Sequence, residues 1–140
     1  MLLKRSKRRH GHGEKGQALV EFVFVLPLFL VLVLAVVDFG MGLHTWISVT
    51  NGAREGARLG SVQATAGEIE TKVRQVTNTL DQAKLTVTTT NAQGDSGEAV
   101  TVQVDYEYDL ITPLGGIIGV LGGSIGSTLD LSSQSEMRLE

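Results

Sequence analysis

The chain has 140 residues and no cysteine, which allows one modest domain beside one membrane segment and excludes a disulfide framework or a thiolate metal site. Six basic residues and one acidic residue fall within residues 1–16, whereas residues 48–140 carry six basic and twelve acidic residues. This separation of charge is typical of a membrane topology and argues against nucleic-acid binding, because an acidic domain repels phosphates.

An uncharged apolar run occupies residues 22–37, and with the residues before it approaches the roughly 20 residues that a helix needs to cross a bilayer. We therefore expect a transmembrane helix over residues 17–47, with Trp46 near the outer interface. The preceding basic cluster predicts a cytoplasmic leader over residues 1–16 and an extracytoplasmic domain over residues 48–140. A cleaved secretory signal is less favoured, because its apolar core is usually only about 7–15 residues long.

Two acidic residues and a proline interrupt the apolar character of this segment. Glu21 lies at its cytoplasmic end, where a carboxylate costs several kcal/mol unless it is paired or reaches the headgroups. Both possibilities remain open for Glu21. Asp38, at the far end, is expected at the membrane interface. Pro27 lacks a backbone donor and is predicted to bend the helix.

A stripe of small residues follows the apolar segment. Gly52, Gly56 and Gly60 recur at every fourth position, with Ala53 and Ala57 beside them. On a helix these residues share a face and allow close approach of another backbone. Each helical glycine costs up to about 1 kcal/mol relative to alanine, which predicts a packing role. The partner is either this chain's own sheet, which is slightly favoured, or another helix or subunit.

A second helix is predicted after this stripe. Residues 65–68 (Thr-Ala-Gly-Glu) have the pattern of a capping box, which marks a helix N-terminus. The helix is amphipathic and is expected to end at residues 81–84. Its apolar stripe consists of Ile69, Val73, Val76 and Leu80.

Three strands are predicted in the rest of the chain. Residues 85–90 are rich in β-branched side chains, and residues 100–109 alternate between apolar and polar side chains. A turn is expected over residues 91–97, and a third strand over residues 128–139. Residues 110–126 are uncharged and glycine-rich, so they are predicted to form a loop. That loop contacts either the membrane or another subunit, or else covers the domain's own core.

These residues also resemble a known family. The run Gly16-Gln17-Ala18-Leu19-Val20-Glu21-Phe22, between basic leader and apolar helix, resembles the processing site of pilin-like precursors. The stretches GQALVEFVFVLPLFLVLVLAVVDFG and NGAREGARLGS are similar to the TadE-like proteins of tight-adherence (Flp-type) pilus systems. VTVQVDYEYDLITPLGG and the final EMRLE add to this resemblance, which covers residues 16–140 and is weakest across residues 61–98.

The resemblance implies a processing site formed by Gly16, Gln17, Glu21 and Phe22. A prepilin peptidase would cleave after Gly16, so that Gln17 becomes the new N-terminus. Glu21 would then pair with the terminal amine of a neighbouring subunit. Such a pair is physically reasonable, because an ammonium group offsets much of the cost of a carboxylate in an apolar environment.

The expected fold is a membrane-anchored α+β protein with a long, pilin-like N-terminal transmembrane helix, a second amphipathic helix and an antiparallel sheet of about three strands. The expected function is that of a non-catalytic TadE-like minor pilin or pseudopilin in the cytoplasmic (inner) membrane. Its partners are the lipid bilayer, prepilin peptidase, other pilin-like subunits and the pilus assembly machinery.

Neither nucleic acid nor a small-molecule substrate is expected as a partner, and no catalytic residue, cofactor or metal site is predicted. His10, His12 and His44 lack metal-ligand spacing with any carboxylate. Two alternative functions remain. The chain could be an uncleaved single-pass scaffold of a secretion or envelope complex, or a secreted binding module released by ordinary signal cleavage. The N-terminal residue of the mature protein distinguishes all three.

Overall fold

The computed structural model describes residues 12–120, 122–123 and 126–140. Residues 1–11, which include most of the predicted basic leader and His10, lie outside the described part. The elements in chain order are α1 (His12–Gly60), α2 (Ala66–Val76), β1 (Leu85–Thr90), β2 (Ala99–Asp109), α3 (Leu114–Val120) and β3 (Thr128–Arg138).

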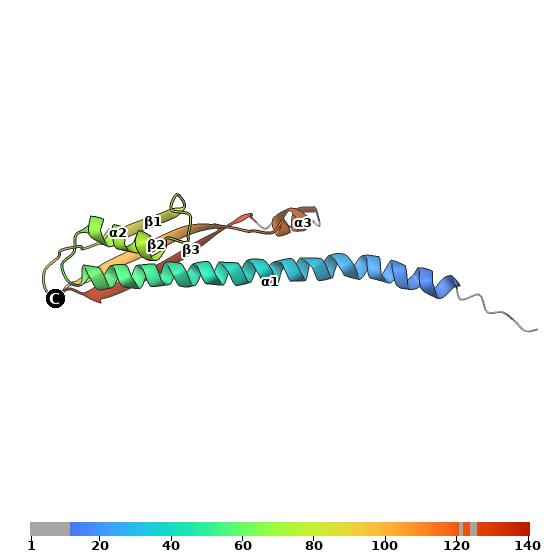
Figure 1. The fold of residues 1–140 in the computed structure, drawn as a ribbon, viewed down its shortest axis with the longest axis horizontal. Coiled ribbons are helices and arrows are strands. Elements are labelled where there is room, and N and C mark those ends of the chain that lie inside the picture. Colours follow the sequence, from blue (N-terminus) through green and yellow to red (C-terminus); the bar gives the residue numbers. More distant parts are fainter. Residues whose placement is uncertain (1–11, 121, 124–125) are drawn as a thin grey trace, which may run out of the picture.

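Helix α1 is a single helix of 49 residues that continues through Pro27 and across the expected domain boundary at residues 47–48. Its C-terminal half lies along α2 and the sheet, whereas its N-terminal half extends beyond the domain (Figure 1). The bend at Pro27 stays a prediction. The same helix therefore supplies both the apolar segment and one layer of the domain.

The three strands form one antiparallel sheet in the order β1-β2-β3. Val104 in the central strand pairs with Val87 of β1 and with Ser133 of β3. Strand β2 alternates as the sequence predicts, with Val100, Val102 and Val104 buried. The predicted fold class is thus confirmed in its long apolar helix, its further helices and its three-stranded antiparallel sheet.

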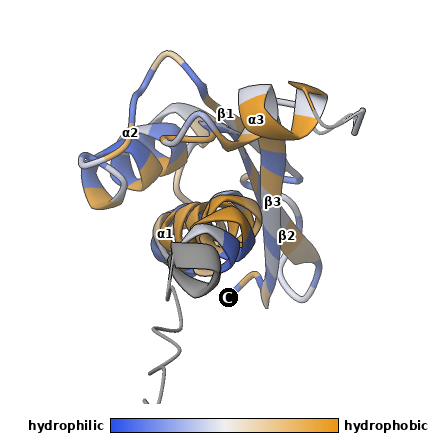
Figure 2. Ribbon diagram, turned by 90° about the vertical axis from the view of Figure 1, so that its right-hand side faces the viewer, coloured by the Kyte–Doolittle hydropathy of each residue, from blue (hydrophilic) through white to orange (hydrophobic). Residues whose placement is uncertain are grey.

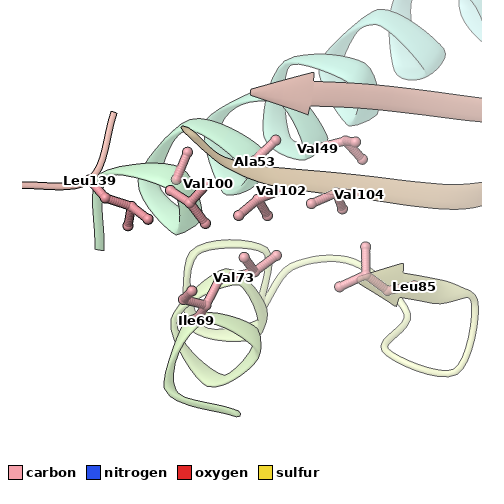
Figure 3. Packing of buried hydrophobic residues seen from close by; sticks show 10 residues of the cluster. Val49, Ala53, Ile69, Val73, Leu85, Val100, Val102, Val104 and Leu139 are labelled. Carbon is pink, nitrogen blue, oxygen red and sulfur yellow. The ribbon is translucent and has the colours of Figure 1, made fainter. Parts of the chain in front are cut away.

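The hydrophobic core lies where α1, α2 and the sheet meet. Seen end-on, α1 has α2 on one side and strands β2 and β3 on the other (Figure 2). Figure 3 shows the side chains of this core converging from the two helices and the sheet. The buried cluster consists of Val49, Ala53, Ala57, Ile69, Val73, Leu85, Val100, Val102, Val104 and Leu139.

Helix α2 begins at the predicted capping box but is shorter than expected. The Thr65 side chain accepts from the Glu68 backbone N–H, and the Glu68 side chain accepts from the Thr65 backbone N–H. The helix ends at Val76 rather than at residues 81–84, because the backbone leaves the helical conformation at the C-cap Thr77 (φ −97°, ψ 24°) and the Leu80 N–H donates to the Thr77 carbonyl in the turn that follows. Consequently Leu80 reaches the core from the following turn instead of from the helix.

The predicted loop over residues 110–126 contains a short helix, α3 (Leu114–Val120). Pro113 precedes this helix, and its carbonyl accepts a hydrogen bond from the Ile117 N–H at 3.0 Å. Proline is tolerated at a helix start because no intrahelical donor is needed there. The prediction of a plain loop was therefore wrong for residues 114–120, while residues 121, 124 and 125 lie outside the described part.

Candidate membrane and assembly surface

The N-terminal half of α1 presents large apolar side chains to its surroundings. Within the described residues, the segment Gly16–Gly60 is long and apolar enough to cross a membrane, and its most apolar window is entirely unburied. Phe24 is 77% exposed and Leu28 is 72% exposed, values unusual for side chains of this size. The exposed set runs from Leu19 to Ile47. An apolar surface of this extent is typical of contact with lipid or protein.

The predicted processing residues lie together near the start of this surface. Gly16, Gln17, Glu21 and Phe22 are all exposed on α1. The Gln17 amide Nε2 donates to Glu21 Oε1 at 3.1 Å, one helical turn along. A Cβ added to Gly16 would meet no atom within 4 Å, so no packing within the domain requires glycine there. The structure thus leaves Gly16 and the Glu21 carboxylate accessible to other molecules.

Asp38 fastens the middle of α1 to the segment between β2 and α3. Its Oδ1 accepts hydrogen bonds from the backbone N–H groups of Ile111 at 2.9 Å and Thr112 at 3.1 Å. The Thr112 hydroxyl donates to Oδ2, and the Tyr108 hydroxyl donates to the Asp38 carbonyl at 3.3 Å. Asp38 is only 4% exposed. Sequence reasoning placed it at the interface but missed this tethering role.

An apolar pocket of about 350 Å³ lies beside this tether. Helix α1 contributes one wall of it, including Phe39 and Trp46, while α3 and β3 contribute Leu114 and Leu129. Trp46 is 46% exposed, so its indole borders both the pocket and the surroundings. The remaining lining residues are Ala35, Asp38, Gly42, Leu43, Tyr108, Leu110 and Leu131. Burial raises the pKa of the Tyr108 hydroxyl, and the nearby Asp38 carboxylate adds to this rise.

The glycine stripe packs against this chain's own domain. A Cβ at Gly52 would lie 2.9 Å from Thr77 Cγ2, and one at Gly56 would lie 2.8 Å from Val73 Cγ2. At Gly60 a Cβ would lie 3.0 Å from Val100 Cγ2. Ala53 and Ala57 are fully buried within the same core. Of the two partners that the sequence allowed, the stripe contacts the internal one.

Three ion-pair groups lie on the described surface of the domain, one of them Arg74 with Glu70 at 2.9 Å. Glu55 binds Arg58 at 2.6 Å and Lys72 at 3.6 Å, and these cations, Arg58 foremost, lower the pKa of Glu55. Lys84 on the segment before β1 pairs with Asp109 at the end of β2. The hydrogen bond from Lys84 lowers the pKa of Asp109. These pairs are exposed to solvent and are therefore expected to adjust rather than dominate stability.

A long helix, unpacked over its first half and packed against a small α+β domain over its second, defines an α+β protein with one N-terminal helix that is long and apolar enough to cross a membrane. Residues 16–58 match the family model described as TadE-like protein. This match confirms the predicted resemblance over that segment and supports a role in tight-adherence pilus assembly at a membrane. No curated protein and no solved structure matches the chain.

Proposed function

We propose that this chain is a non-catalytic minor pilin or pseudopilin that takes part in assembling a tight-adherence (Flp-type) pilus. The observation that carries the proposal is that the two halves of α1 pack differently. Its C-terminal half contributes Val49, Ala53 and Ala57 to the domain core, while large apolar residues from Leu19 onward stay exposed. A helix built this way offers its free half to lipid before assembly and to neighbouring helices afterwards.

The proposed location is the cytoplasmic (inner) membrane, with the N-terminus inside and the C-terminus extracytoplasmic. Residues 1–16 carry six basic side chains and one acidic side chain directly before the apolar helix. Positively charged flanks are retained on the cytoplasmic side of a membrane, which supports this orientation. The acidic domain over residues 48–140 would then lie outside, where α2 and the sheet pack on the second half of α1.

Processing by a prepilin peptidase is proposed after Gly16. The position is exposed on the helix and free of contacts from the folded domain, which supports access by a protease. Cleavage would turn the backbone nitrogen of Gln17 into an ammonium group. The Glu21 carboxylate already accepts a hydrogen bond from the Gln17 side chain. Its remaining lone pairs would accept from the terminal ammonium of a neighbouring subunit, which would set the register between adjacent helices.

The mechanism that we propose is lateral transfer from bilayer to pilus or priming complex. The apolar surface of α1 exchanges lipid for neighbouring helices, while the Glu21–ammonium pair compensates the two charges in the apolar environment. The domain does not need to refold during this step, since its core lies on the other half of α1. The proposed function thus consists of packing α1 against neighbouring helices and requires no catalytic group.

Mass spectrometry of the protein extracted from membranes tests the processing step. Cells with an active prepilin peptidase should yield a chain that begins at Gln17, and cells lacking the peptidase should yield the intact leader. Gly16→Leu should block cleavage, whereas the control Gly40→Leu, at another uncrowded position of α1, should not. An intact leader in the presence of the peptidase contradicts the proposal and favours the uncleaved scaffold. Soluble protein lacking residues 17–47 favours the secreted module.

A further inference from the structure

Strand β2 runs back along α1 toward the apolar half of the helix. Near its start, Val100 faces Gly60, where an added Cβ would lie 3.0 Å away, and Val102 faces Gly56 at 3.1 Å. Near its end, Tyr108 faces Gly42 at 3.6 Å. Each step along β2 therefore moves the chain closer to the N-terminal half of α1, and the segment that follows the strand continues in that direction (Figure 1).

Asp38 fixes the position along α1 at which the segment after β2 lies. The Asp38 carboxylate accepts from the backbone of Ile111 and Thr112, and Leu114 then lines the same pocket as Ala35. Helix α3 consequently lies beside α1 on the N-terminal side of Asp38. The rise from Ala18 to Asp38 is about 30 Å at about 1.5 Å per residue. If Asp38 lies at the edge of the roughly 30 Å hydrocarbon layer, as the sequence predicts, α3 lies at the depth of the leaflet next to Asp38.

The chemistry of this segment suits an apolar environment. Residues 110–127 contain no charged side chain. Ile111 is 60% exposed and Val120 is 88% exposed, and neither faces the domain core. The hydrogen bonds from Ile117 N–H to the Pro113 carbonyl and from Gly123 N–H to the Ile118 carbonyl satisfy some of the backbone groups that hydrocarbon would leave unpaired. Charged residues resume at once on the domain side of this segment, where Asp109 pairs with Lys84.

We propose that α3 and the adjoining pocket form a second membrane contact, in which α3 dips into the leaflet nearest Asp38 and the pocket accepts a lipid acyl chain. The pocket's volume of about 350 Å³ and its wall of Phe39, Leu43 and Leu129 fit a section of hydrocarbon chain. The contact is continuous with the exposed apolar surface of α1. It rests on the proposed crossing of the bilayer by residues 17–47, which the experiment tests separately.

Single-tryptophan fluorescence in lipid nanodiscs with one full-length copy per disc tests this contact. Trp46→Phe removes the chain's one tryptophan. Into this background, Val120→Trp places a probe on α3, and Val62→Trp places a matched probe at an exposed position beyond the far end of α1. Phe29→Trp, in the middle of the apolar run, reports on the bilayer crossing itself. The quenchers are phosphatidylcholine brominated on its acyl chains and, in the aqueous phase, acrylamide.

The expected result is strong quenching by brominated lipid at positions 29 and 120, with a blue-shifted emission, and quenching by acrylamide alone at position 62. Quenching by brominated lipid at position 29 but by acrylamide at position 120 would overturn the α3 contact and leave the crossing intact. Protection from both quenchers at position 120 would overturn it too, and would indicate that protein covers α3. Absence of lipid quenching at position 29 would overturn both the crossing and the contact.

Discussion

The carboxylate of Asp38 accepts a hydrogen bond from the backbone N–H of Thr112 at 3.1 Å, although 74 positions separate the two residues in the sequence. With the bond from Ile111 and the contact from the Thr112 hydroxyl, this relationship joins the middle of α1 to the end of the sheet. These bonds fix the position along α1 at which the end of the sheet contacts the helix.

Replacing Asp38 with alanine should loosen the segment between β2 and α3. The N–H groups of Ile111 and Thr112 would lose their acceptor, so their hydrogen exchange should accelerate roughly tenfold or more. Asp38→Asn should have a smaller effect, because the amide oxygen still accepts. Hydrogen-exchange mass spectrometry of the protein in nanodiscs measures the change. Asp130→Ala, on the exposed side of β3, is the matched control, and equal protection in Asp38→Ala and the wild type would refute the tether.

Adding a methyl group at Gly56 should destabilise the domain. The new Cβ would lie 2.8 Å from Val73 Cγ2 and 3.1 Å from Val102 Cγ1, and both valines are stiff and fully buried. Overpacking of this kind costs about 1–3 kcal/mol, which exceeds the gain of up to about 1 kcal/mol in helix propensity. Gly56→Ala should therefore lower the urea midpoint of unfolding in detergent micelles.

The control for this prediction is Gly67→Ala in the first turn of α2, where an added Cβ meets no atom within 4 Å. That variant gains helix propensity without a clash and should be neutral or slightly more stable. If both alanine variants shifted the urea midpoint in the same direction by the same amount, the close approach of α1 to α2 and β2 would be disproved.

The Lys84–Asp109 pair should make stability depend on pH at the acidic end. The hydrogen bond from Lys84 lowers the pKa of Asp109 in the folded chain, so the folded state holds the carboxylate charged more strongly than the unfolded state does. The contribution of the pair is therefore present above the ordinary aspartate value of 3.8 and fades as the pH falls below it through the lowered pKa.

Urea unfolding of the wild type and Asp109→Asn at a series of pH values measures this contribution. The wild type should be more stable near neutral pH, and the difference should shrink toward zero in strong acid. Added salt should reduce the same difference, since exposed charges are screened. A difference between the two proteins that stays constant from neutral pH to strong acid would rule out the pair as its source.

Removing the charge at Glu21 should impair assembly without preventing membrane insertion. If Glu21 pairs with a neighbour's terminal ammonium, Glu21→Gln and Glu21→Ala leave that ammonium uncompensated at each junction that this chain makes. A loss of about 1.4 kcal/mol per junction already weakens association tenfold, so pilus output should fall at least about tenfold. Immunoblots of sheared pili and of membrane fractions measure output and insertion. Glu107→Gln, at an exposed carboxylate of β2, is the control, and normal output from both Glu21 variants would exclude the pair.

The local elements were the part of the fold that the sequence predicted well. The alternation from Val100 to Val104 and the capping box at Thr65 depend on neighbouring residues, so they are readable along the chain. The end of α2 was misplaced, because Leu80 stays in phase with the apolar stripe although the backbone already leaves the helix at Thr77. Helix α3 was missed because its glycines and the preceding Pro113 have low helix propensity, so the local sequence predicts a loop.

The assembly surface was predictable only in part. The free apolar helix and the Gly16–Phe22 pattern follow from hydropathy and motif spacing. The role of Asp38 was not predictable, because its partners are backbone N–H groups that any residue type supplies and that lie far away in the sequence. The pocket beside Trp46 likewise requires α1, α3 and β3 to be brought together by the fold.

Because α1 runs from His12 to Gly60 as one helix, a tilt imposed on its apolar end also tilts the end that carries the domain. Its length is about 74 Å at about 1.5 Å per residue, and a tilt of about 20° displaces one end sideways from the other by roughly 25 Å. Neighbouring helices that reorient the apolar end of α1 must therefore also move the domain at its other end. A partner that binds the apolar half of α1 would therefore also change the orientation of the folded domain.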